Sequence, residues 1–252
     1  MVAGLLGMSE MHTALVSIES CSLVAPRCSP LLAGVQACRV RVESPLPPEL
    51  ERIALPPALH SAVPKRQSEF RAGRYCAMTA LAALDPRFDG WDVARHDSGA
   101  PVWPEGVVGS ISHSDGVAAA MVATTAVAAG LGIDTERVMS ESQARSVGRM
   151  VAWPSEIAHG RAAGLSRLEA LTLVFSAKES IFKCLHPLVG CYFDFHDVRI
   201  EGVEAGTATF VARIVRRLAD VVPAQTVLEG RFELEATRIH TGVALQPHMV
   251  VA

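Results

Sequence analysis

Three acidic residues have the chemical type and the spacing of ligands for a hard divalent cation. Asp134 and Glu136 stand two residues apart at the end of a long apolar stretch, and Glu179 follows in the segment FSAKES at 175–180. Residues two apart on a strand face the same side, so Asp134 and Glu136 can converge on one ion. With carboxylate oxygens and no neighbouring Cys or His in the sequence, the expected ion is Mg²⁺, which also takes ligands from phosphate groups. By itself, an Asp-x-Glu pair is more often the solvated end of an ordinary strand.

Glu179 and Lys183 lie four residues apart, which places them on one face of a helix. Such a pair is ordinarily a surface ion pair. Here the helix is apolar at most other positions, so we expect it to be largely buried and its polar groups, Lys178 included, to have partners. The apolar positions are Leu168, Leu171, Val174, Phe175, Ile181 and Phe182.

Two further groups of residues could bind phosphate. Ser112 and His113 lie in the segment GSISHS at 109–114, where they could donate to a phosphate or simply complete a hydrogen-bonded turn. Arg66 and Arg74 are two helical turns apart and can reach the same side of their helix, and arginine forms forked contacts with phosphate. A solvated helix face is the ordinary explanation for two such arginines.

The hydrophobic pattern predicts the strands and helices that must position these side chains. Apolar runs predict strands over 36–43, 107–113, 117–123, 126–134, 198–203, 208–214, 227–236 and 241–245. Helices are predicted over 65–84, 141–151, 155–163 and 167–185, and Pro187 is expected to end the last of them. This order predicts an α+β protein with a poorly specified extension (1–30), an N-terminal lobe (31–126) and a C-terminal lobe (127–252).

The composition excludes several classes of protein. The 252 residues carry a net charge of −3, which does not favour bulk binding to nucleic acid or to an anionic membrane. The six cysteines contain no C-x-x-C pair, so neither a zinc site nor a disulfide framework is expected. The uncharged stretch 116–133 is rich in small residues, and two buried strands explain it better than a membrane span. Because the N-terminus also lacks the pattern of a signal peptide, we expect a cytoplasmic protein.

Five segments in a fixed order carry a family resemblance. Together they resemble the larger, two-lobed class of 4′-phosphopantetheinyl transferases, in the subgroup that includes enterobactin synthase component D. The likeness runs from about Leu59 to Leu245. The segments are KRQSEFRAGRYCA (65–77), APVWPEGVVGSISHS (100–114), GIDTE (132–136), FSAKESIFKCLHP (175–187) and FDFHDV (193–198).

The resemblance implies two similar α+β lobes, related by a pseudo-twofold axis, with coenzyme A in the cleft between them. It implies that Asp134, Glu136 and Glu179 hold Mg²⁺, or Mn²⁺ in its place, and that Lys183 contacts the pyrophosphate. Glu179 and Lys183 are then the catalytic pair, with Glu179 accepting the proton directly or through a metal-bound water. The remaining residues that the resemblance assigns to coenzyme A are Arg66, Arg74, Gly99, Ala100, Pro101, Ser112 and His113.

The implied reaction transfers the 4′-phosphopantetheine group of coenzyme A to a serine of an apo acyl or peptidyl carrier protein. Adenosine 3′,5′-bisphosphate is released, and a monomeric enzyme of siderophore, polyketide or fatty acid synthesis is expected. Ala100 stands where some relatives carry a lysine, and Thr135 where isoleucine is commoner. Two alternatives stay open: a Mg²⁺-dependent phosphodiesterase acting on a nucleotide pyrophosphate, and a non-catalytic relative that binds coenzyme A.

Overall fold

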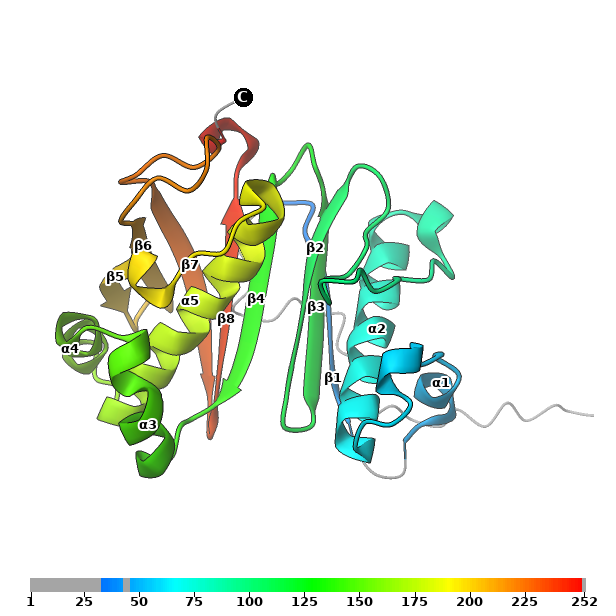
Figure 1. Ribbon diagram of the computed structural model, residues 1–252, viewed down its shortest axis with the longest axis horizontal. Helices are drawn as coiled ribbons and strands as arrows, with labels where there is room; N and C mark the ends of the chain where they lie inside the picture. Colours follow the sequence, from blue (N-terminus) through cyan, green and yellow to red (C-terminus); the bar gives the residue numbers. More distant parts are fainter. Residues whose placement is uncertain (1–32, 43–45, 251–252) are drawn as a thin grey trace, which may run out of the picture.

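The computed structural model describes residues 33–42 and 46–250. The extension predicted at residues 1–30 lies outside the described residues. Within them, the chain forms a three-stranded and a five-stranded antiparallel sheet, each with a long helix across one face (Figure 1). The α+β class expected from the sequence is confirmed. No helix in this part of the chain is long and apolar enough to cross a membrane.

The N-terminal unit is a helix packed on a sheet whose strand order is β1-β3-β2. Its elements are β1 (Gln36–Arg41), α1 (Pro48–Glu51), α2 (Pro64–Leu84), β2 (Val107–Ser114) and β3 (Val117–Thr124), with 3-10 turns at Pro57–Leu59 and Pro86–Phe88. Pro64 is the first residue of α2. Its lack of an N–H costs nothing there, because the first N–H groups of a helix have no hydrogen-bond acceptor within the helix. Small residues on the inner face of α2 allow close packing on β3: Ala72, Cys76, Ala77 and Ala80.

The C-terminal unit has the strand order β4-β8-β7-β6-β5, and α5 packs on β4 and β8 (Figure 1). Its strands are β4 (Gly130–Arg137), β5 (Val198–Glu204), β6 (Thr209–Ile214), β7 (Val227–Glu235) and β8 (Arg238–Leu245). Its helices are α3 (Glu141–Val151), α4 (Pro154–Ala162) and α5 (Arg167–Val189), with 3-10 turns at Phe195–Asp197 and Pro247–Met249. Capping boxes begin α3 at Ser140 and α5 at Ser166.

Most predicted elements agree with the structure to within a few residues, and the differences have local causes. The prediction that Pro187 ends its helix was wrong, because α5 continues to Val189. A proline so near the end costs the helix only one backbone hydrogen bond, and the helix stops instead at Gly190, whose φ of 63° suits glycine. β4 begins at Gly130 rather than at 126, because a turn occupies residues 125–127. β8 begins three residues early, because a tight turn pairs Arg238 with Glu235.

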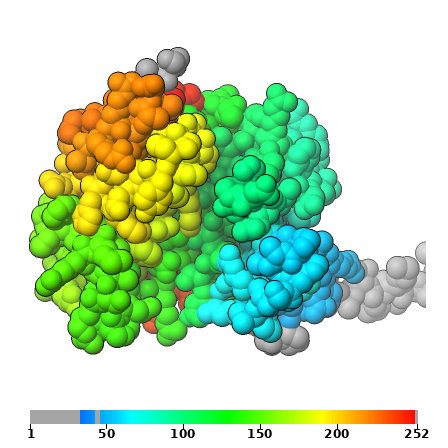
Figure 2. Space-filling view, viewed as in Figure 1, coloured from blue at the N-terminus to red at the C-terminus, as the bar shows by residue number. Residues whose placement is uncertain are grey.

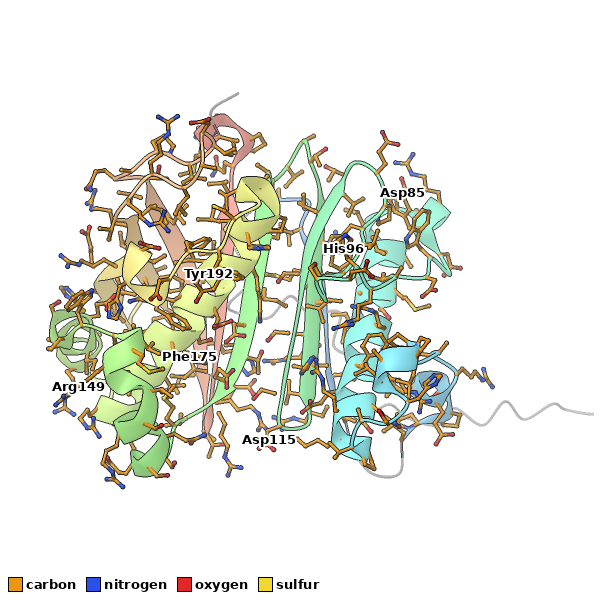
Figure 3. All side chains as sticks on the ribbon, in the orientation of Figure 1. Asp85, His96, Asp115, Arg149, Phe175 and Tyr192 are labelled. Carbon is orange, nitrogen blue, oxygen red and sulfur yellow. The ribbon has the colours of Figure 1, made fainter. Side chains whose placement is uncertain are left out.

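The two sheets meet where β2 and β4, an edge strand of each, pack side by side. In the space-filling view, the blue-to-teal N-terminal unit and the yellow-to-orange residues of the C-terminal unit lie on opposite sides, with green residues between them (Figure 2). At the foot of this junction, Asp115 in the β2–β3 turn contacts cations from three other elements (Figure 3). They are Lys65 at 3.1 Å, Arg137 at 3.0 Å and Arg238 at 3.7 Å.

Candidate functional site

Two glycines of β4 let the backbone of α5 lie directly against the strand. A Cβ added at Gly132 would stand 1.8 Å from the carbonyl oxygen of Ser180 and 2.7 Å from the N of Cys184. At Gly130, a Cβ would stand 2.5 Å from the carbonyl oxygen of Cys184. Only glycine permits this approach, which brings the polar residues of α5 beside the carboxylates at the end of β4.

The four residues of the proposed catalytic centre lie within electrostatic reach of one another. Lys183 Nζ stands 2.7 Å from Asp134 Oδ1. Burial and the charges of Asp134 and Glu179 raise the pKa of Glu136 to about 7, against the opposing charge of Lys183. Burial and the charge of Asp134 also raise the pKa of Glu179. Three carboxylates therefore share a mostly buried space with a single ammonium group.

This arrangement fits a divalent cation. Asp134 Oδ2 is buried and has no hydrogen-bond partner. A cation would satisfy that oxygen and offset the repulsion that raises the two glutamate pKa values. Among the described residues, no three His, Cys, Asp or Glu side chains already enclose a common point at ligand spacing. The side chains of Glu136 and Glu179 would therefore have to rotate to share an ion with Asp134.

His113 and Arg66 form a second polar group beside this centre. Arg66 Nη1 donates to His113 Nε2 at 2.7 Å, and Glu69 stands 3.5 Å from the other ring nitrogen. Burial, followed by the charges of Arg66 and Lys183, lowers the pKa of His113 to about 4. The imidazole is therefore neutral at pH 7, and the half-exposed guanidinium of Arg66 keeps donors for a further ligand.

Arg74 has surroundings quite unlike those of Arg66. Its guanidinium stacks over the ring of Phe70 at 4.7 Å, and its Nε is buried without a partner. Burial and the nearby charge of Arg95 lower the pKa of Arg74 to about 10, while Asp92 opposes the shift. Arg66 thus lies in the first turn of α2, whereas Arg74 lies at the middle of the helix, near the segment that leads into the loop at 99–101.

A cavity of about 850 Å³ opens between the two units. Gly99, Ala100 and Pro101 line it, as does Lys183. The other lining residues come mainly from β2, the start of β4 and the end of α5, and most of them are apolar. The volume suits a drug-sized or cofactor-sized ligand. His96, whose position Figure 3 shows, also lines this cavity, and the sequence reasoning did not single it out.

A smaller cavity of about 130 Å³ lies beside Glu179. It is lined by aromatic side chains that sequence reasoning did not assign to the site: Phe182, Tyr192, Phe193 and Phe195. The segment FDFHDV was noted only as part of the resemblance. Its two phenylalanines, so soon after a helix end, are the signal that could have indicated an aromatic wall.

Two family models match the chain. Residues 55–123 match the 4′-phosphopantetheinyl transferase N-terminal domain, and residues 130–228 match the 4′-phosphopantetheinyl transferase superfamily. The chain is 31% identical over 206 residues to the 4′-phosphopantetheinyl transferase PptT of Mycobacterium tuberculosis, covering 80% of this chain and 86% of that protein. It is 41% identical over 160 residues to the transferase Svp of Streptomyces mobaraensis, covering 61% of each. It is 41% identical over 129 residues to enterobactin synthase component D of Escherichia coli, covering 50% of this chain and 57% of that protein.

The chain belongs to the 4′-phosphopantetheinyl transferase superfamily. The enzyme class and the family expected from the sequence are thereby confirmed, and the family implies coenzyme A as the substrate. The matches to Svp and to enterobactin synthase component D span less than two thirds of those proteins.

Proposed function

We propose that this protein moves the 4′-phosphopantetheine arm of coenzyme A to a serine of an apo acyl or peptidyl carrier protein, with Mg²⁺ as cofactor. One observation carries the proposal: three carboxylates and a lysine, from β4 and α5, lie within electrostatic reach of one another, and the lysine also lines the large cavity between the units. Bond exchange at a pyrophosphate depends mainly on positioning and charge neutralisation, which such a group supplies.

The cavity is the proposed cleft for coenzyme A. The loop at Gly99, Ala100 and Pro101 would receive the adenine, and Arg66, Arg74 and His113 would serve the phosphates of the nucleotide. The two units, 31–126 and 127–252, would act as lobes related by an approximate twofold axis. This is supported by the long helix that each packs on an antiparallel sheet, and by the edge strands through which they meet. We also propose that the protein is a monomer, which light scattering on a sizing column would check.

Asp134, Glu136 and Glu179 would hold the Mg²⁺, or Mn²⁺ in its place. When bound, the ion would supply positive charge to the pyrophosphate oxygens. Lys183 would turn from Asp134 toward the same oxygens and stabilise the charge that develops as the P–O bond opens. Glu179 would accept the proton of the carrier serine, directly or through an ordered water.

The test is mass spectrometry of an apo carrier protein incubated with the enzyme, Mg²⁺ and coenzyme A. A carrier protein from siderophore assembly is the first choice of substrate for this test, because some relatives are named as components of enterobactin synthase. We expect a gain of one phosphopantetheine, its absence in excess EDTA, and a much slower gain with Lys183→Ala. Cleavage of coenzyme A without any carrier would instead indicate a phosphodiesterase. Binding of coenzyme A with neither transfer nor cleavage would indicate a non-catalytic relative.

A further inference from the structure

Two buried serines of β2 join the edges of the two sheets. Ser110 and Ser112 are each 3% exposed. Ser110 Oγ accepts a hydrogen bond from the backbone N–H of Ile133 at 3.1 Å, and Ser112 Oγ accepts one from the N–H of Thr135 at 3.0 Å. β4 is the edge strand of its sheet, so on this side these N–H groups have no strand of the same sheet as a hydrogen-bond partner. The two hydroxyls therefore take the place of ladder hydrogen bonds between the sheets.

Ser112 makes two contacts that Ser110 lacks. Its hydroxyl donates to Asp134 Oδ1 at 3.1 Å, and Lys183 Nζ stands 3.4 Å from the same hydroxyl oxygen. A hydroxyl has one proton to donate and two lone pairs to accept with. The Ser112 proton is used by Asp134, and the lone pairs by Thr135 and Lys183. The Ser112 hydroxyl therefore has no proton left to donate to a phosphate.

This contact decides which oxygen of Asp134 is available. Oδ1 is held by Ser112 and Lys183, whereas Oδ2 is buried and has no partner. A carboxylate with one oxygen held in place can no longer rotate freely about its last bond. The free oxygen is then presented in a fixed direction, as with outer partners that orient the ligands of metal sites.

Alternation along β2 separates Ser112 from its neighbour. Successive side chains on a strand point to opposite faces. Accordingly, Ser112 meets β4, while His113 meets Arg66 and Glu69 on α2. Adjacent residues of one motif thus have different surroundings and different tasks.

We propose that Ser112 is a positioning residue that reaches across the junction of the two units, orients Asp134 and presents its Oδ2 to a divalent cation. This inference rests on the proposed function, because it deepens the role of the same metal site. It replaces the phosphate contact that the resemblance implies for this serine. It also makes the metal site depend on both units, since the cation ligands lie on one unit and the residue that orients Asp134 lies on the other.

The experiment compares Ser112→Ala with Ser110→Ala, because both variants remove a buried hydroxyl and the acceptor of one β4 N–H. We expect both to lower Tm by similar amounts. Binding of Mn²⁺, followed by the electron paramagnetic resonance of free Mn²⁺ without coenzyme A or carrier, separates them. Ser112→Ala should weaken binding by roughly 10- to 100-fold, the usual effect of losing such an outer partner. Ser110→Ala should stay within about twofold of the unmodified protein, because it does not touch a ligand.

Each other outcome overturns the inference. Unchanged Mn²⁺ affinity in Ser112→Ala, with a raised KM for coenzyme A, would make this serine a phosphate ligand. An equal loss of affinity in both variants would make the effect a general loosening of the junction. If Ser112→Ala does not fold, Ser112→Cys keeps nearly the same volume with a weak donor, and the same titration applies. Absence of Mn²⁺ binding in the unmodified protein would instead contradict the proposed metal site itself.

Discussion

Lys178 Nζ lies 2.8 Å from Glu156 Oε1, and both side chains are almost fully excluded from solvent, at 1% and 0% exposure. The carboxylate of Glu156 also accepts the backbone N–H groups of Trp153 and Ile200. The ammonium of Lys178 also donates to the carbonyl of Val151. The pair therefore ties the α3–α4 connection and β5 to α5, one residue before Glu179.

Breaking this pair from one side should be strongly destabilising. We expect Lys178→Met to lower the free energy of unfolding by about 3–5 kcal/mol, because it leaves a carboxylate buried without a counter-charge. Urea unfolding of the metal-free protein measures the loss. The double variant Glu156→Gln with Lys178→Met should recover part of it, since glutamine is neutral and its side-chain oxygen still accepts from the backbone. A double variant no more stable than Lys178→Met would contradict this account.

Gly132→Ala should separate α5 from β4. The added Cβ would stand 1.8 Å from the carbonyl oxygen of Ser180, so the helix must shift, at a cost of at least the roughly 1–3 kcal/mol typical of overpacking. Transfer activity should fall further than stability, since the shift moves the residues of α5 away from those of β4. Gly202→Ala is the matched control on another strand, where the nearest atom to the new Cβ is 3.9 Å away. Equal effects of the two substitutions would show that the close approach is unimportant.

Glu136 should make the metal-free protein less stable as pH rises. Its pKa is about 7 in the folded protein, against an ordinary value of 4.5, because of burial and the neighbouring carboxylates. Between these values the folded protein holds a proton that the unfolded chain has lost. The contribution to stability is thus full below about pH 4.5 and declines as pH rises through 7.

Thermal unfolding in EDTA checks this sign. Relative to Glu136→Gln, the unmodified protein should lose Tm between pH 5 and pH 7.5. Added Mg²⁺ should reverse the trend, because the ion needs the ionised carboxylate and competes with the proton. Parallel Tm curves for the two proteins in EDTA would show that Glu136 does not titrate in this range.

Arg66 and Lys183 should affect different kinetic constants. Arg66 contacts His113, and we propose that it holds the nucleotide end of coenzyme A, so its contact should be similar in the ground and transition states. Arg66→Ala should mainly raise KM for coenzyme A and leave kcat within a few-fold. Lys183→Ala should mainly lower kcat, by roughly 10²-fold or more, as expected for loss of a preorganised charge-stabilising group. Steady-state transfer assays with a saturating carrier separate the two constants.

Coenzyme A without its 3′-phosphate tests the contact of Arg66. If Arg66 binds that phosphate, the truncated cofactor should be almost insensitive to Arg66→Ala, because the partner is already absent. An equal rise in KM with both cofactors would exclude this contact and leave Arg74 or His113 as the better candidate.

Much of the fold could be predicted from the sequence because it depends on local pattern. Helix α3 was placed at its observed bounds, and α2 within one residue at its start, since hydrophobic periodicity and capping residues act over a few positions. The uncharged stretch 116–133 was correctly interpreted as two buried strands around a short connection. The prediction for Pro187 was wrong because the local rule about proline does not take account of its position in the helix. So close to the end of α5, proline removes only one backbone hydrogen bond, and the helix can continue past it.

The sequence by itself determined the types of groups at the proposed site and their order along the chain, and these were enough to indicate the family. Only the tertiary structure decided which atoms meet. The hydroxyl of Ser112 meets Asp134, 22 residues away, and Lys178 meets Glu156 from a neighbouring helix. Arg74 is buried, although it is two turns from the half-exposed Arg66 on the same helix. Such contacts depend on the register between edge strands and on how closely a helix packs. Those are set by long-range packing, to which residues far apart in the sequence contribute together.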